Sequence, residues 1–161
     1  MNAPMPCITI CSSANFYRQV VDIEKELKDM EFDVIIPYTA QIMKQSDDFD
    51  VSHYKTWFGD KNDYHKKTDL MLKHFDKIAK GDAILVINNE KHGVANYIGG
   101  NVLMEMAIAL YLKKPIFLFN EVPKESSFLE EIIGMFPVLL HGDIAALPKE
   151  YEKLGTKQAV A

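Results

Sequence analysis

Short runs of apolar, β-favouring residues alternate with longer helical patterns along almost the whole chain. The apolar runs are residues 7–11, 32–36, 83–87, 116–119 and 138–140. The helical patterns are residues 16–30, 63–80, 101–113, 127–133 and 144–154. Strands alternating with helices predict a parallel sheet with right-handed crossovers and helices on both faces. We therefore expect one α/β domain over residues 1–161, a doubly wound five-stranded parallel sheet of flavodoxin or Rossmann type with strand order 2-1-3-4-5, and a fraying tail over 155–161.

One segment interrupts this alternation. Pro37 is expected to end the second strand. Residues 38–60 are polar and aromatic, and their apolar residues show no clear helical or strand period. A connection this long is uncommon in a compact domain and is often a lid or a binding loop. Aromatic side chains gather in or near the connecting loops, where some could stack on a base and others close the core: Tyr38, Trp57, Phe58, Tyr64 and Tyr97.

The charge balance limits the partners. A net charge of −5 over 161 residues argues against a nucleic-acid surface and against an anionic membrane. No apolar run approaches membrane-spanning length, and residues 1–6 lack the basic and apolar regions of a signal peptide. A cytoplasmic protein is expected.

The two cysteines, Cys7 and Cys11, fall on the first predicted strand. Their separation of roughly 13 Å along a strand is too long for a disulfide. They also lack metal-type spacing, and the five histidines form no metal motif. We expect two buried thiols in a reducing compartment, no metal centre and no cofactor.

Glu105 is the only Asp, Glu, Lys or Arg between Lys91 and Lys113. It is expected in the first turn of an apolar helix that starts from Gly99 and Gly100, with Asn101 as the N-cap. A carboxylate there is costly unless it is used, and the helix dipole favours its ionised form. The pattern predicts covalent or acid–base chemistry on a phosphorylated or sugar-like ligand. Capping is the structural alternative, although a capping box would place the acid one residue earlier.

Ligands of doubly wound sheets bind beyond the carboxyl ends of the strands, at the switch in strand order. This rule brings the turn after the first strand beside the loop after the third. The candidate binding residues are Ser12, Ser13, Asn15, Asn88, Gly99, Gly100 and Asn101. Hydroxyls and backbone N–H groups at a helix start can cradle a phosphate, and ordinary N-capping explains Ser and Asn equally well.

The helix over residues 63–80 carries the other titratable candidates. His65, Asp69 and Lys73 are spaced four apart, so a solvated charged face explains them. His74 is more often structural than catalytic in such a position, and it stays open as a group that touches the substrate.

Together these segments resemble the nucleoside 2-deoxyribosyltransferase superfamily, which includes 2′-deoxynucleoside 5′-phosphate N-hydrolases. The matching segments are residues 8–13, 81–86, 97–109 and 113–118. The resemblance implies that Glu105 is a nucleophile that displaces the base from a deoxyribosyl group, after which water or a second base accepts the sugar. It also implies that residues 12–15 and 99–101 hold the sugar or its 5′-phosphate.

The chain departs from the family pattern in two places. Ser12 stands where the family usually has Gly, and the position of the family's second acid is taken by His74, with Asp69 one turn earlier. Either residue could assist base departure by proton transfer. Family members often complete the site with a residue from a neighbouring subunit, so a homodimer is expected, with Ser126 or Ser127 as the donated group.

Two other classes of function fit the same pattern. A noncatalytic nucleotide-binding or sensing domain would use the same pocket without needing Glu105. A flavodoxin-like electron carrier would purify as a yellow, flavin-loaded protein.

Overall fold

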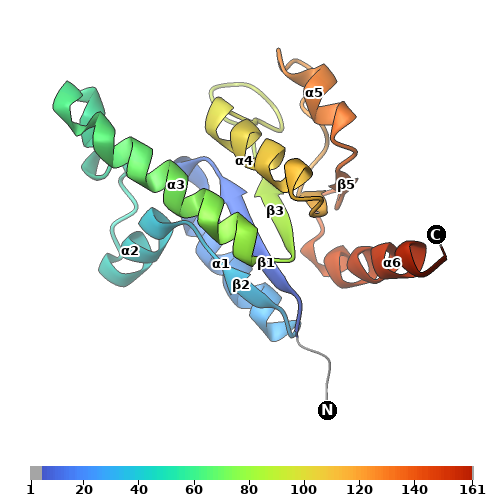
Figure 1. Ribbon diagram of the computed structural model, residues 1–161. Coiled ribbons are helices and arrows are strands. Elements are labelled where there is room, and N and C mark those ends of the chain that lie inside the picture. Colours follow the sequence, from blue (N-terminus) through green and yellow to red (C-terminus); the bar gives the residue numbers. More distant parts are fainter. Residues whose placement is uncertain (1–4, 161) are drawn as a thin grey trace.

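The structure, a computed structural model, describes the backbone of residues 5–160 and the side chains of residues 5–156 (Figure 1). Residues 1–4, part of the segment compared with a signal peptide, lie outside the described residues, as does Ala161. Five parallel strands form one sheet in the order β2-β1-β3-β4-β5. The strands are β1 Cys7–Ser12, β2 Asp33–Ile35, β3 Ala83–Ile87, β4 Ile116–Leu118 and β5 Val138–Leu139. The predicted α/β fold and strand order are confirmed.

The helices lie in two layers around the sheet (Figure 1). They are α1 Tyr17–Asp29, α2 Tyr38–Ser46, α3 Tyr64–Lys80, α4 Gly100–Tyr111, α5 Leu129–Gly134 and α6 Leu147–Val160. Short 3₁₀ turns are η1 Ala14–Phe16, η2 Val51–His53, η3 Thr56–Phe58, η4 Lys61–Asp63 and η5 Ile144–Ala146. Core residues of α1 and α6 pack on one face, and those of α3, α4 and α5 pack on the other.

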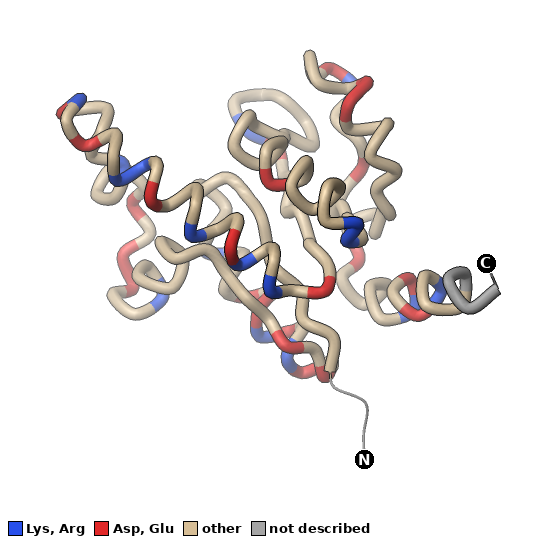
Figure 2. The backbone as a smooth tube through the Cα atoms, in the orientation of Figure 1, with Lys and Arg blue, Asp and Glu red and all other residues tan. Residues whose placement is uncertain are grey.

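The two-residue period of the strands decides which side chains meet which helices. Ile8 and Ile10 of β1 point to the α1 and α6 side. Cys11 belongs to the opposite core, with Ile84 and Val86 of β3. The central strands β1, β3 and β4 carry no charged residue, and the charges lie along helices, loops and the start of the edge strand β2 (Figure 2). Cys11 is therefore placed beneath α3 and α4.

The segment over residues 38–60 was expected to be a loop, and this prediction was wrong. It contains α2 and the turns η2 and η3. Pro37 is the N-cap of α2, a place where its missing N–H costs nothing. Ala40 and Met43 are three residues apart and both are buried, so one face of α2 packs into the molecule.

Three further expectations need correction. The N-cap of α4 is Gly99 and not Asn101, so Glu105 lies in the second helical turn, beyond the first. The final helix continues to Val160 and not to 154, because Gly155 does not adopt the left-handed conformation that ends helices. Cys7 is half-buried, since it begins β1 at the edge of the core, whereas Cys11 is fully buried.

None of the helices in the described part of the chain combines the length and the apolar character needed to cross a bilayer.

Gly81 joins α3 to β3 at a point where the backbone passes close to β1. A Cβ there would overlap Thr9 Oγ1 and lie 3.3 Å from the carbonyl oxygen of Cys7. Thr9 is fully buried, and its Oγ1 donates to the carbonyl of Lys77. The Thr9 side chain therefore cannot move aside freely. We expect Gly81→Ala to lower the free energy of unfolding by about 1–3 kcal/mol in urea denaturation.

Gly155→Ala is the matched control for that substitution. Gly155 lies within α6, and its Cβ would enter open space. Alanine there should stabilise the protein by roughly 0.5–1 kcal/mol, because glycine is the weaker helix former. Equal effects of the two substitutions would contradict the close contact at Gly81.

Candidate functional site

The candidate site lies at the switch in strand order between β1 and β3. The chain leaves β1 toward α1 on one face, and it leaves β3 toward α4 on the other. Two adjoining pockets open there, of about 560 Å³ and about 550 Å³. Five residues line both pockets: Ala14, Tyr17, Lys55, Lys67 and Asn101. The two pockets thus form one continuous site of two parts, which we call the carboxylate pocket and the lysine pocket.

Glu105 reaches the carboxylate pocket from α4 and is only 4% exposed. The Asn101 amide, one turn earlier on the helix, donates to Glu105 Oε1 at 2.7 Å. Among the described residues, no nitrogen or hydroxyl donor bonds Oε2. Burial raises the pKa of Glu105 to about 8, although the Cys11 thiol, the Lys67 ammonium and the Asn101 amide lower it. The carboxyl group is held in place through one oxygen and leaves the other available.

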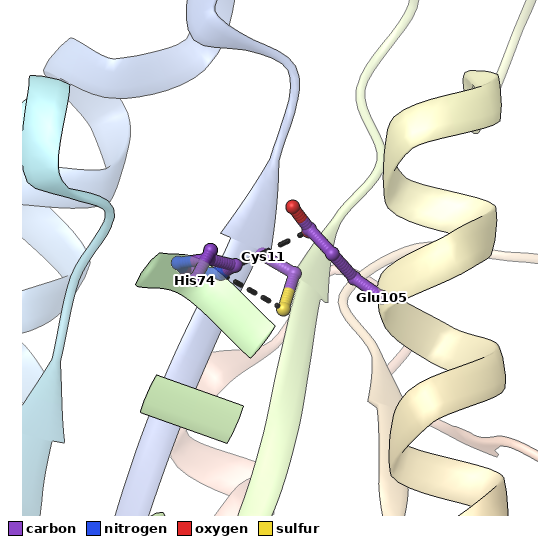
Figure 3. A group of neighbouring side chains, drawn as sticks. All are labelled: Cys11, His74 and Glu105. Carbon is purple, nitrogen blue, oxygen red and sulfur yellow. Dashed lines mark hydrogen bonds and ion pairs between the residues drawn. The ribbon is translucent and has the colours of Figure 1, made fainter. Parts of the chain in front are cut away.

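His74 reaches the same pocket from α3 and is 6% exposed. Its Nε2 lies 3.4 Å from Cys11 Sγ and 3.8 Å from Glu105 Oε2 (Figure 3). Burial, helped by the charge of Lys77, lowers the pKa of His74 to about 4. The imidazole is therefore neutral near pH 7, and it is unsuited to donate a proton to a departing base.

Asp69 does not reach the carboxylate pocket as His74 does. It is exposed and does not line the carboxylate pocket, whereas Lys67, Leu70, Met71 and His74 do. These four residues recur at helical spacing and mark the inward face of α3, from which Asp69 is rotated away. His65 is exposed as well, so His65 and Asp69 lie on the solvated face of α3 and do not face the same region as His74.

Cys11 completes the cluster from beneath. One sulfur, one imidazole nitrogen and one carboxylate oxygen, from Cys11, His74 and Glu105, all lie within 4.8 Å of one another. Burial raises the pKa of the Cys11 thiol well above its usual range, and the nearby Glu105 raises it further. Cys11 was expected to lack companions of the metal-ligating type. That expectation was wrong, because the companions come from α3 and α4 and not from β1.

The lysine pocket concentrates positive charge in an acidic protein. Lys91 donates to Ser13 Oγ at 2.8 Å, and Lys67 donates to Asn101 Oδ1 at 2.7 Å. Burial lowers the pKa of both lysines, and the charge of Lys55 lowers both further. Three ammonium groups around one cavity, where Lys55 repels both Lys67 and Lys91, indicate a site for an anion.

The sequence-predicted binding residues divide into two groups. Five of them line the lysine pocket: Ser12, Ser13, Gly99, Gly100 and Asn101. The other two do not: Asn15 is exposed and accepts a bond from Ser13, and Asn88 is fully buried. Asn88 accepts from the backbone N–H of Asn120 and donates to the carbonyl of Glu121. Its side chain thus joins the segments that follow β3 and β4, and it is not free to bind a ligand.

The aromatic candidates divide in the same way. Trp57 and Tyr38 line the carboxylate pocket, and Tyr97 lines the lysine pocket. Phe58 and Tyr64 line neither pocket and are exposed. Ser126 and Ser127 line neither pocket within this chain, and Ser126 Oγ accepts the backbone N–H of Phe128.

Sequence reasoning missed Tyr17 and the three lysines. Burial, and then the charge of Glu105, raise the pKa of Tyr17, so its hydroxyl keeps its proton and can donate to a ligand or to the carboxylate. Lys67 lies seven residues before His74, on the same helical face, and this spacing was a usable signal. Lys55 and Lys91 come from separate segments, and only the fold brings them together.

The arrangement offers a buried carboxylate with one free oxygen, a neutral imidazole and a cationic cavity beside them. No protein-family model matches the chain, and no curated protein matches it either.

Proposed function

We propose that the protein cleaves the N-glycosidic bond of a 2′-deoxynucleoside 5′-monophosphate, with Glu105 as the nucleophile. The observation that carries the proposal is the free Oε2 of a buried carboxylate, facing a pocket that adjoins a lysine-lined cavity. The resemblance to the nucleoside 2-deoxyribosyltransferase superfamily supplies the sugar and the type of bond.

The reaction has two steps. Glu105 Oε2 forms a bond to the anomeric carbon, and the base leaves with the electron pair of the C–N bond and takes up a proton from the solvent. Water then attacks the same carbon and loses a proton to the solvent, the ester bond breaks, and the carboxylate is restored together with deoxyribose 5-phosphate. A second base in place of water would give transfer. Because the sugar lacks a 2′-hydroxyl, the positive charge that develops on it is less disfavoured.

The roles of the remaining groups follow from their contacts. Asn101 bonds Glu105 Oε1 and therefore orients Oε2, while Lys67 holds Asn101 in turn. Lys67 also lowers the pKa of Glu105 and so favours the ionised nucleophile. His74 is neutral, which leaves it the role of a hydrogen-bonding group and not that of the proton donor.

The lysine pocket suits the 5′-phosphate. A phosphate dianion would relieve the repulsion that Lys55 exerts on Lys67 and on Lys91. The backbone at the start of α4 lies in the same pocket, where helix N–H groups favour an anion. These groups argue for a nucleotide over a free nucleoside.

A second candidate is a noncatalytic nucleotide-binding domain. It is favoured by one observation: with a pKa of about 8, Glu105 is largely protonated near neutral pH before a ligand binds. Both candidates require nucleotide binding, and only the first requires release of the base.

The deciding experiment is incubation with each 2′-deoxynucleoside 5′-monophosphate, followed by chromatography for free base and deoxyribose 5-phosphate. Parallel reactions with a second free base distinguish transfer from hydrolysis. Tight nucleotide binding with no base released from any substrate would favour the binding domain and reject the glycosidase.

Lys91 offers the cleanest test of the phosphate subsite, because it contacts Ser13 and lines only the lysine pocket, whereas Glu105 lines only the carboxylate pocket. We expect Lys91→Met to raise KM for the monophosphate by about tenfold or more, since it removes a charge-assisted contact of roughly 1.5–3 kcal/mol. The KM for the matching nucleoside should change less than threefold. Steady-state kinetics on the two substrates provide the comparison.

Lys149→Met is the control, because Lys149 is an exposed lysine on α6. It removes the same charge at a residue that lines neither pocket, and it should leave the KM values for the nucleotide and for the nucleoside unchanged. Equal losses on nucleotide and nucleoside in Lys91→Met would contradict a phosphate subsite there.

A further inference from the structure

Cys11, His74 and Glu105 point toward one another from three different elements, β1, α3 and α4 (Figure 3). The glycosidase reaction uses Glu105, but it gives no role to a thiol beside an imidazole. All three side chains are more than nine-tenths buried. Among the described residues, this is the group of histidine, cysteine and acidic side chains whose ligand atoms converge.

The separations match those of ligands around one small ion. With Zn–S near 2.3 Å and Zn–N or Zn–O about 2.0–2.2 Å, neighbouring ligand atoms of a tetrahedral site lie about 3.3–3.6 Å apart. Here the sulfur-to-nitrogen distance is 3.4 Å and the nitrogen-to-oxygen distance is 3.8 Å. Small side-chain rotations suffice to close the remaining gap.

The carboxylate supplies a second, independent observation. Among the described residues, no nitrogen or hydroxyl group donates to the buried Glu105 Oε2, whereas Oε1 is fixed by Asn101. Buried polar oxygens nearly always have a partner, so an unpaired one indicates a ligand. The Asn101 bond also resembles the outer hydrogen bonds that orient metal-ligating carboxylates.

We propose that Cys11 Sγ, His74 Nε2 and Glu105 Oε2 bind one zinc ion, with the fourth position open to the carboxylate pocket. Thiolate, imidazole and carboxylate together suit zinc, whereas harder ions prefer oxygen ligands alone. On binding, the Cys11 thiol and the Glu105 carboxyl release their protons to solvent, and the two negative charges balance the ion. His74 and Glu105 line the pocket, so the ion has a route in.

This site has a consequence for turnover, and that consequence rests on the proposed function. Zinc would occupy the same oxygen that attacks the sugar. The metal-bound protein would then be inactive, and removing the metal would restore base release. The binding site itself stands on the geometry and needs no glycosidase activity.

Cobalt(II) titration of the metal-free protein tests the site. Thiolate ligation gives a near-ultraviolet sulfur-to-cobalt charge-transfer band, which should saturate at one equivalent and disappear when zinc is added. The chain has only two cysteines, so Cys7→Ser leaves Cys11 as its sole thiol and should keep the band. Cys11→Ser should lose it.

His74→Gln should weaken cobalt binding by more than the 10–100-fold that loss of an outer partner causes. Circular dichroism checks that each variant is folded. If the wild type gives no charge-transfer band, or if Cys7→Ser loses the band, the proposal is overturned. Cys7→Ser and the wild type decide the matter even if Cys11→Ser does not fold.

Activity separates this proposal from the glycosidase itself. If base release occurs, stoichiometric zinc should reduce it at least tenfold and a chelator should restore it. Base release without a cobalt band would overturn the zinc site alone. A cobalt band with no base release from any nucleotide would support the zinc site and reject the glycosidase.

Discussion

Replacing Glu105 with glutamine should reduce base release by at least about 10³-fold, the scale expected when a covalent nucleophile is removed. Glutamine keeps the size of the side chain and can still accept the Asn101 hydrogen bond at Oε1. It cannot form the glycosyl ester. The rates should be compared at about pH 9, because burial raises the pKa of Glu105 to about 8 and the wild-type carboxylate is then ionised. Chromatography of the free base measures the rate of base release for the wild type and for Glu105→Gln.

Binding must be measured beside the rate. Titration calorimetry with the monophosphate should give dissociation constants for Glu105→Gln and the wild type that agree within about threefold, since the lysine pocket is untouched. Asp69→Asn serves as the matched control, because it neutralises an exposed carboxylate on α3 that lies outside both pockets. It should keep the wild-type rate. Undiminished base release from Glu105→Gln would refute the mechanism.

The fold was accessible from sequence because its signals are local and repeated. β3 is five apolar residues long, is buried along its whole length, and has the boundaries that its composition predicts. The segment over residues 38–60 failed because its helix α2 packs only through a few residues, such as Ala40 and Met43. That pattern is too short to stand out against its polar neighbours.

The site was accessible where the strand-end rule applied, as it did for Ser13 and Gly99, or where one residue was anomalous in its own segment. Glu105 qualified as a lone charge in an apolar helix. Lys55 and Lys91 did not, because lysine is ordinary on polar segments and becomes informative only when several converge. Lys67 carried a signal only through its helical spacing from His74. Asn88 shows the opposite error. It stands at a strand end where ligand-binding residues are common, but the backbone beyond β4 takes up its hydrogen bonds.

Cys11 illustrates a limit of spacing arguments. Its distance from Cys7 along the strand excludes a disulfide, and that conclusion stands. Its companions His74 and Glu105 are 63 and 94 residues away in sequence, on helices that cross the same face of the sheet. No motif spacing within one element could have indicated them.

The same buried carboxyl should make the stability of the protein fall as the pH rises. The pKa of Glu105 is about 8 in the folded protein against an ordinary 4.5, so between these values the folded state holds a proton that the unfolded state has lost. Each pKa unit corresponds to about 1.4 kcal/mol. Relative to Glu105→Gln, the wild type should therefore lose roughly 5 kcal/mol of unfolding free energy between about pH 4.5 and pH 8. Urea denaturation of both proteins across this range measures the difference.

Glu24 provides a control of opposite sign within the same chain. Burial alone would raise the pKa of Glu24, but hydrogen bonds from Lys28 and Lys44, at 2.6 Å and 2.8 Å, outweigh it and lower the pKa. Its contribution to stability is therefore present above its ordinary pKa and is lost as the pH falls through the lowered value. Glu24→Gln should cost stability at neutral pH, and this cost should shrink in acid.

If the difference in unfolding free energy between Glu105→Gln and the wild type stays constant from pH 4.5 to pH 8, Glu105 is ionised throughout that range. The carboxylate would then be a nucleophile ready to act at neutral pH without prior loss of a proton.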